Sequence, residues 1–161
     1  MAKEIERKFL VTDDSFIPLA SSASHIRQAY ISTSPDATVR LRIRDTEAFL
    51  TVKGRNAGAV RDEWEFRIPV AEAEEMALKL CGGFAIDKTR YIVTHEGWRW
   101  EVDLFHGRLS GLTVAEIEMP TADSNPPLPK FIGREVTGDP RYYNSVLSMP
   151  DSVIPDTTAD V

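Results

Sequence analysis

Polar and apolar residues alternate with a period of two along most of this chain. A period of two puts successive side chains on opposite faces of a β-strand, so each alternating segment is predicted to be a strand. Eight segments show it: residues 4–9, 26–31, 38–44, 49–53, 63–70, 87–94, 98–104 and 113–119. Turn-forming residues such as Asp45, Gly54, Gly97 and Gly111 stand between the segments, which predicts short connections.

Two segments follow a helical period instead. In residues 71–80, Ala73, Met76, Ala77 and Leu80 recur at helical spacing with glutamates opposite, which predicts a helix. Residues 140–149 are predicted to form a second helix, with Tyr143, Val146 and Leu147 on one face. A short turn is expected at residues 15–20 and a proline-rich loop at 124–129.

These elements predict one α+β domain, mainly β, over residues 1–149. Residues 150–161 have little to bury and are expected to form a disordered tail. Sequential strands with short connections favour an antiparallel sheet, which can close into a barrel or fold into a sandwich. The alternation by itself leaves both architectures open.

The charged residues are sorted by sign from strand to strand, whereas solvated faces usually mix signs. Glu4, Glu6 and Lys8 share one face, and the opposite faces of the strands carry apolar residues such as Leu41 and Trp100. The charged faces can point outward to water, as in most half-buried sheets. They can also point into a barrel whose apolar exterior packs against helices.

Four of the carboxylates are paired along strands. Two carboxylates at i and i+2 lie about 7 Å apart and repel by about 0.6 kcal/mol in water, but by roughly 2 to 3 kcal/mol at an effective dielectric near 20. Inside a tunnel they would need cations, and hard oxygen ligands suit Mg²⁺ or Mn²⁺. The candidate metal ligands are Glu4, Glu6, Glu116 and Glu118.

Basic residues fall on the same faces by parity and form a candidate phosphate cradle, because Arg grips phosphate oxygens bidentately and Lys acts as a compact charge. They are Lys8, Arg40, Arg42, Lys53, Lys88 and Arg90. Glu63, Glu65, Glu101 and Asp103 complete the charged faces, either as cross-strand ion pairs or as contacts to metal or water. Tyr30 is left with two alternatives, a hydrogen bond to phosphate or packing at the mouth of the tunnel.

Composition narrows the function. The chain has 161 residues and a formal net charge of −6, which argues against a protein that coats nucleic acid. It contains no apolar run of the roughly 20 residues that a membrane span needs, and residues 1–6 lack the apolar core of a signal peptide, so a cytoplasmic location without a membrane partner is expected. Cys81 is the only cysteine, which excludes an internal disulfide.

The run Glu4-Ile5-Glu6-Arg7-Lys8 resembles the ExExK signature of the CYTH superfamily, the triphosphate tunnel metalloenzymes. Further motifs follow in the order that similar family members show: Arg40-Leu41-Arg42, Thr51-Val52-Lys53, Glu63-Trp64-Glu65, Lys88-Thr89-Arg90, Glu101-Val102-Asp103, Glu116-Ile117-Glu118 and Glu135-Val136-Thr137. The resemblance covers residues 3–148. It implies an eight-stranded antiparallel β-barrel with a charged lumen and a few helices packed outside.

The resemblance also implies site roles. Glu4, Glu6, Glu116 and Glu118 match the metal-binding acids, and Lys8, Arg40, Arg42, Lys53, Lys88 and Arg90 match the phosphate-binding bases. Two Mg²⁺ or Mn²⁺ ions are expected, one on the phosphates and one activating a water for in-line attack. Glu4, Glu6 and Lys8 are the expected catalytic residues. Lys8 is either a general base or a purely electrostatic group.

The leading functional hypothesis is hydrolysis of inorganic tripolyphosphate to diphosphate and phosphate. It is favoured because the strand positions expected to face the lumen include no inserted aromatic segment that would stack against a nucleobase or a thiazolium ring. Hydrolysis of thiamine or nucleoside triphosphates and a class IV-type adenylate cyclase are alternatives that use the same residues. A non-catalytic polyphosphate-binding module is a further alternative, which the paired carboxylates disfavour. The expected partner is a small triphosphate, and a homodimer through the apolar outer face is left open.

Overall fold

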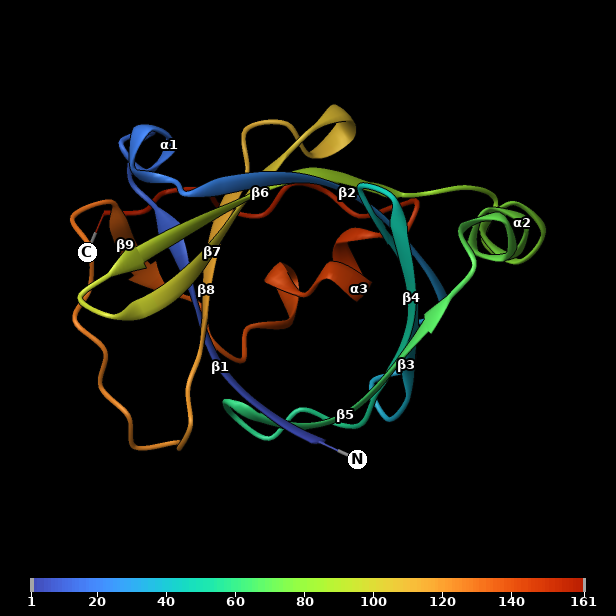
Figure 1. The fold of residues 1–161 in the computed structure, drawn as a ribbon, viewed down its shortest axis with the longest axis horizontal. Helices are drawn as coiled ribbons and strands as arrows, with labels where there is room; N and C mark the ends of the chain where they lie inside the picture. The colour runs from blue at the N-terminus through green and yellow to red at the C-terminus, as the bar shows by residue number, and fades with distance from the viewer. Residues whose placement is uncertain (1, 161) are drawn as a thin grey trace.

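The computed structural model describes residues 2–160, whose nine strands form one antiparallel sheet in which eight strands close into a barrel (Figure 1). The strands are β1 (Ala2–Val11), β2 (Ser22–Ser32), β3 (Thr38–Arg44), β4 (Glu47–Lys53), β5 (Val60–Ile68), β6 (Ile86–His95), β7 (Trp98–Phe105), β8 (Thr113–Glu118) and β9 (Ile132–Glu135). Their order is β5-β4-β3-β2-β6-β7-β8-β1-β9, and an additional β5–β1 pairing closes the ring. The expected barrel is therefore confirmed.

Strand β1 closes the barrel because it changes partners along its length. Its first half pairs with β5, so that Glu4 lies opposite Arg61. Its second half pairs with β8, where Glu6 lies opposite Glu118 and Lys8 opposite Glu116. The first and eighth strands thus meet, and their charged faces lie side by side.

Tight hairpins set the register of neighbouring strands. Between β6 and β7, His95 pairs with Trp98, so the connection has only Glu96 and Gly97. Both turn residues have positive φ, 49° and 81° respectively. That is the conformation of a type I′ turn, whose twist matches the twist of the flanking strands.

Strand β9 was not predicted. It spans only Ile132–Glu135, too short for a period of two to stand out. It pairs with the end of β1, where Phe9 lies opposite Glu135. Strand β5 ends at Ile68, earlier than the predicted limit, because Pro69 begins the following helix as its N-cap.

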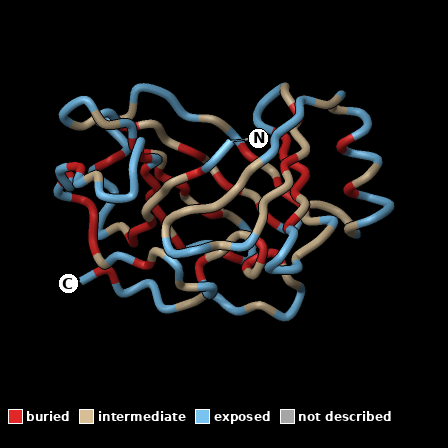
Figure 2. The backbone as a smooth tube through the Cα atoms, turned by 90° about the horizontal axis from the view of Figure 1, so that it is seen from below, coloured by how far each residue is buried: buried red, intermediate tan, exposed pale blue. Residues whose placement is uncertain are grey.

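Helix α1 (Phe16–Leu19) and helix α2 (Val70–Cys81) cover apolar faces on the outside of the barrel. Helix α2 confirms the predicted helix: it buries Ala73 and Ala77, packs the partly buried Met76 beside them, and exposes most of its other residues to solvent (Figure 2). Gly82 ends it in the left-handed conformation, at φ 73°, which glycine adopts without a Cβ penalty. No helix within residues 2–160 has the length and apolar character that a membrane crossing requires.

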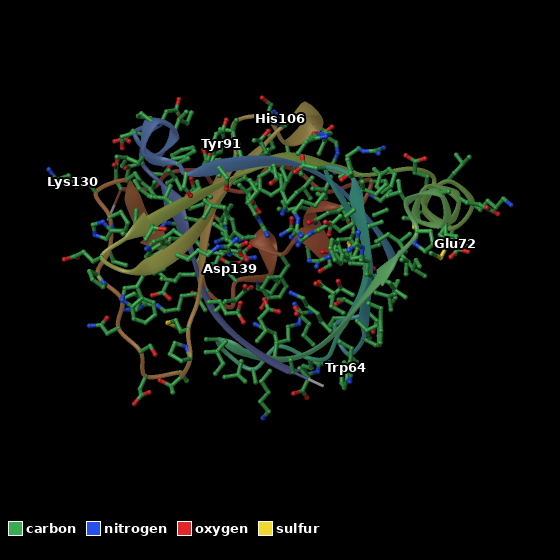
Figure 3. The ribbon with its side chains drawn as sticks, in the orientation of Figure 1. Trp64, Glu72, Tyr91, His106, Lys130 and Asp139 are labelled. Atoms are coloured by element: carbon green, nitrogen blue, oxygen red, sulfur yellow. The ribbon has the colours of Figure 1, made fainter. Side chains whose placement is uncertain are left out.

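Tryptophan side chains lie on the outer face, as their parity predicts. Trp100 is completely buried and packs against Phe9, with their ring centroids 5.6 Å apart. This cluster also includes Phe16 of α1 and Phe131 from the loop before β9. Trp64 on β5 remains 37% exposed and points away from the ring of strands (Figure 3).

The C-terminal helices differ from the expectation in shape and place. Residues 140–149 form the short 3₁₀-helix η2 (Pro140–Tyr142) and helix α3 (Asn144–Leu147), separated by Tyr143, whose backbone is extended. Seen down the barrel, α3 lies within the ring of strands and not outside it (Figure 1). Tyr142 and Leu147 join an apolar cluster with Leu10 and Phe105, together with Leu109 of the 3₁₀-helix η1 (Gly107–Leu109).

Residues 150–160, which the sequence predicts to be a disordered tail, contain no helix or strand and form hydrogen bonds to Arg134 of β9 and to Tyr142. The Arg134 backbone N–H donates to the Ala159 carbonyl at 2.9 Å, and the Tyr142 hydroxyl donates to the Asp156 carbonyl at 2.6 Å. Gly133 permits this approach, because a Cβ there would clash with Ala159. Residues 1 and 161, which the predicted domain and tail include, lie outside the described part of the chain.

Candidate functional site

A polar cavity of about 220 Å³ lies inside the barrel. Nitrogen and oxygen atoms crowd the interior of the ring of strands (Figure 3). The lining includes nine of the ten residues expected to bind metal or phosphate: Glu4, Glu6, Glu116, Glu118, Lys8, Arg40, Arg42, Lys53 and Arg90. The charged faces therefore point inward, and the alternative of a solvated outer face is excluded for these strands.

The four expected metal ligands come from β1 and β8, and burial and repulsion by neighbouring acids raise the pKa of two of them, Glu6 and Glu118. Burial, with the nearby charges of Glu116 and Glu4, raises the pKa of Glu6 well above its usual value. The pKa of Glu118 is also raised, by burial and then by Glu4 and Glu101. A divalent cation would relieve this repulsion, so the chemistry of the donor set fits a hard metal ion.

Lysines stand close to these acids in the structure. Lys53 Nζ lies 2.7 Å from Glu4 Oε2, although that buried oxygen accepts no bond of hydrogen-bond geometry. Lys8 Nζ lies 3.6 Å from Glu116 Oε1. Within residues 2–160, no three or more His, Cys, Asp or Glu side chains are grouped so as to hold a metal ion. Binding of Mg²⁺ or Mn²⁺ therefore stays a prediction that rests on the donor chemistry.

Two arginines of β3 supply buried positive charge. Burial, with Arg40 and Arg90 nearby, lowers the pKa of Arg42 to about 9. The Arg42 Nε donates to Gln28 Oε1 at 2.9 Å. The Arg40 Nε is buried and has no hydrogen-bond partner in the structure. An unsatisfied buried donor of this kind costs free energy that an anionic ligand can recover.

Lys88 is the expected phosphate ligand that does not line the cavity. Its side chain is fully buried, and its Nζ lies 2.7 Å from Asp103 Oδ2. Burial lowers the pKa of Lys88 to about 7 despite Asp103. Asp103 also accepts two bonds from Arg90, at 2.8 and 2.9 Å. For Asp103, the cross-strand ion pair is therefore the alternative that the structure supports.

The other inward carboxylates also contact bases or hydroxyls. Glu101 Oε2 lies 3.1 Å from Arg90 Nη1. Glu65 accepts a bond from the Thr51 hydroxyl at 2.9 Å. Burial, followed by the hydrogen bond with Glu4, raises the pKa of Glu63 to about 7. Glu63 is therefore a candidate proton-binding site near neutral pH.

Replacing Glu63 with glutamine is expected to stabilise the metal-free protein at pH 8. Burial raises the pKa of Glu63 from about 4.5 in the unfolded chain to about 7 in the folded protein. The folded protein therefore loses stability as the pH rises from the unfolded pKa to the folded pKa, and none further above it. Because Glu63 is half-buried and screened by solvent, we expect a gain of about 1 kcal/mol at pH 8 and almost none at pH 5. Urea unfolding with EDTA present measures this, with Glu72→Gln on α2 as the control. An equal gain at both pH values would contradict the prediction.

The structure adds lining residues that the strand pattern did not reveal. Tyr143, Asn144 and Ser145 line the cavity from the C-terminal segment. Lys8 Nζ lies over the Tyr143 ring, 5.6 Å from its centroid, and also donates to the Tyr142 carbonyl at 3.2 Å. Residues 140–149 were expected to pack outside the barrel, and no pattern in their sequence indicates that they would enter the lumen. Tyr30 lines the cavity too, in keeping with a location on the inward face.

Comparisons with known proteins agree with this geometry. An inorganic triphosphatase of Acetivibrio thermocellus is 48% identical over 147 residues, which cover 91% of this chain and 94% of that protein. An inorganic triphosphatase of Nitrosomonas europaea is 38% identical over 150 residues, which cover 91% and 97%.

Solved structures share the fold. The crystal structure of the inorganic triphosphatase NE1496 has a TM-score of 0.63 and 36% identity, covering 90% of this chain and 97% of that one. The structure of HpAC1 from Hippeastrum, at 16% identity and a TM-score of 0.57, covers 73% and 80% and shows the fold alone. The CYTH domain family matches residues 2–143. This chain belongs to the CYTH domain family.

Proposed function

We propose that this chain hydrolyses inorganic tripolyphosphate to diphosphate and phosphate in its barrel cavity, with Mg²⁺ or Mn²⁺ as cofactor. The observation that carries the proposal is the cavity lining, in which the four expected metal-binding carboxylates stand beside five of the expected phosphate-binding side chains. Relatives that are 48% and 38% identical to this chain are named inorganic triphosphatases, which supports the same substrate class here.

The bases would bind and orient the substrate. Arg40 and Arg42 lie on β3, across the lumen from β1, and both are buried, so water screens their charges weakly. The unpartnered Arg40 Nε is a donor for a phosphate oxygen. Arg90 is held in one orientation by its paired bonds to Asp103. A polyanion would thus enter a site whose donors are fixed before it binds.

Glu4, Glu6, Glu116 and Glu118 would hold the divalent ions. When bound, such ions neutralise phosphate charge and lower the pKa of a coordinated water. Lys8 stands next to these acids: burial opposes its charge, but Glu116 and Glu6 raise the pKa of Lys8 above the ordinary value. A lysine that stays protonated stabilises negative charge, so we favour the electrostatic role of Lys8 over that of a general base.

Thiamine or nucleoside triphosphate hydrolysis is the second candidate. The sequence pattern indicated no aromatic insert in the lumen, yet Tyr30 and Tyr143 both line the cavity. Aromatic side chains can stack against a base or a thiazolium ring. The two tyrosines therefore weaken the preference for inorganic tripolyphosphate, which rested on the absence of aromatic residues in the lumen. Organic triphosphates stay among the test substrates.

The deciding experiment incubates purified protein with tripolyphosphate, ATP or thiamine triphosphate, each with Mg²⁺, Mn²⁺ or EDTA, and identifies the products. We expect phosphate and diphosphate, released fastest from tripolyphosphate and absent with EDTA. Faster release from ATP or thiamine triphosphate would favour the second candidate. Cyclic AMP with diphosphate would indicate a cyclase, and binding without turnover would indicate a polyphosphate-binding module.

A further inference from the structure

A continuous series of polar contacts runs along the cavity wall and joins three of the expected phosphate-binding bases. Six side chains take part, in the order Arg42, Gln28, Asn144, Lys88, Asp103 and Arg90. The middle contacts are the bond from Gln28 Nε2 to Asn144 Oδ1 at 3.3 Å and the bond from Lys88 Nζ to the same oxygen at 3.0 Å. Gln28 and Lys88 are both completely buried.

The directions of these bonds are determined by the two ends of the chain. Arg42 has only donors, so Gln28 must turn its oxygen toward Arg42 and its amide nitrogen toward Asn144. The ammonium of Lys88 is also a donor, so the oxygen of Asn144 must face both Gln28 and Lys88. A rotated amide at either position would set two donors against each other.

Of these six hydrogen-bonded side chains, Asn144 alone does not come from a barrel strand. It begins α3, in the segment whose Tyr142 and Leu147 pack into an apolar cluster, and it also lines the cavity. Its single amide oxygen joins the Lys88–Asp103–Arg90 group to the Gln28–Arg42 group. The C-terminal segment therefore contacts the expected phosphate-binding side chains directly as well as packing into the apolar cluster.

We propose that Asn144 is a positioning residue for triphosphate binding, which holds Lys88 and Gln28 and, through Gln28, the guanidinium of Arg42. The inference rests on the proposed function of the cavity. Without the amide oxygen, Lys88 loses one of its acceptors and keeps Asp103, and Gln28 is free to turn away from Arg42. The Arg42 guanidinium then loses the side-chain acceptor that fixes it inside the barrel.

The test is Asn144→Leu, which keeps the size of the side chain but removes the amide. Hydrogen bonds that involve charged groups are strong, so KM for tripolyphosphate is expected to rise about tenfold, with a smaller change in kcat. A merely structural defect would lower the amount of active protein, and therefore kcat, without raising KM. Ser148→Ala is the control: its hydroxyl donates to the Ser145 carbonyl at 2.8 Å in the same segment and takes no part in the chain.

A double-mutant cycle with Gln28→Leu separates a connected chain from independent effects. The double variant is expected to have a KM close to that of the weaker-binding single variant, because both changes release Arg42. Additive effects, or a KM for Asn144→Leu within about twofold of wild type, would overturn the proposal. If Asn144→Leu does not fold, Asn144→Ser, which is too short to reach both donors, takes its place with the same expected rise.

The wild-type protein separates this inference from the proposed function. If wild type releases no phosphate from any triphosphate, the proposed function fails, and calorimetric affinity for tripolyphosphate replaces KM as the readout for Asn144. A wild-type affinity that Asn144→Leu lowers about tenfold still supports the positioning role. Equal affinities of the two proteins would overturn it.

Discussion

Glu6→Gln is expected to reduce metal-dependent phosphate release from tripolyphosphate by at least about 100-fold, since changes to groups that only orient metal ligands already cost 10- to 100-fold. Glu6 lies on β1 directly opposite Glu118 of β8. These two paired strands carry all four expected metal ligands. The amide has nearly the same shape as the carboxyl but no negative charge. The measurement is the rate of phosphate release over a series of Mg²⁺ and Mn²⁺ concentrations.

The stability of the same variant should move in the opposite direction. Burial and the charges of Glu116 and Glu4 raise the pKa of Glu6, so its ionised form destabilises the metal-free protein above its usual pKa. Removing that charge is expected to raise the free energy of unfolding at pH 8. Lost activity in a more stable protein points to metal binding and not to misfolding. Full activity of Glu6→Gln, beside an unchanged Glu72→Gln control, would refute the assignment.

Asp103→Asn is expected to destabilise the protein by roughly 3 kcal/mol or more at pH 7, as when one partner of a buried ion pair is removed. Its carboxylate is almost completely buried and compensates both Lys88 and Arg90. The asparagine removes the counter-charge of Lys88 and leaves Arg90 with Glu101. Urea denaturation compares the variant with Asp87→Asn: the exposed Asp87 carboxylate pairs with His25, and its loss should change stability by about 0.5 kcal/mol or less.

The pH dependence tests the cause of that loss. Burial opposes ionisation of Asp103, but Arg90 and Lys88 outweigh it and hold the pKa of Asp103 well below its usual value. A depressed folded pKa gives stability that is present above the unfolded pKa, about 3.9, and lost as the pH falls below it. The part of the gap between wild type and Asp103→Asn that comes from the carboxylate charge should therefore shrink below about pH 4. A gap that does not change with pH would assign the loss to packing.

Much of the barrel could be predicted because side-chain parity is a local property of a strand. Arg40 and Arg42 must share a face whatever the rest of the chain does, and both line the cavity. The helix at residues 71–80 was also predictable, since its apolar residues repeat along several turns and the structure places α2 at Val70–Cys81. Strand β9 and the break at Tyr143 could not be predicted, because such short elements show no repeat.

For the site, the sequence by itself determined which residues carry charge and which of them share a face of one strand. The tertiary structure decided which of these residues meet. It pairs β1 with β8, buries Lys88 against Asp103 and brings Asn144 into the lumen. The physical reason is that alternation along a strand depends on neighbouring residues alone. Closure of the barrel, burial of an ammonium group and docking of a four-residue helix depend on contacts between segments far apart in the chain.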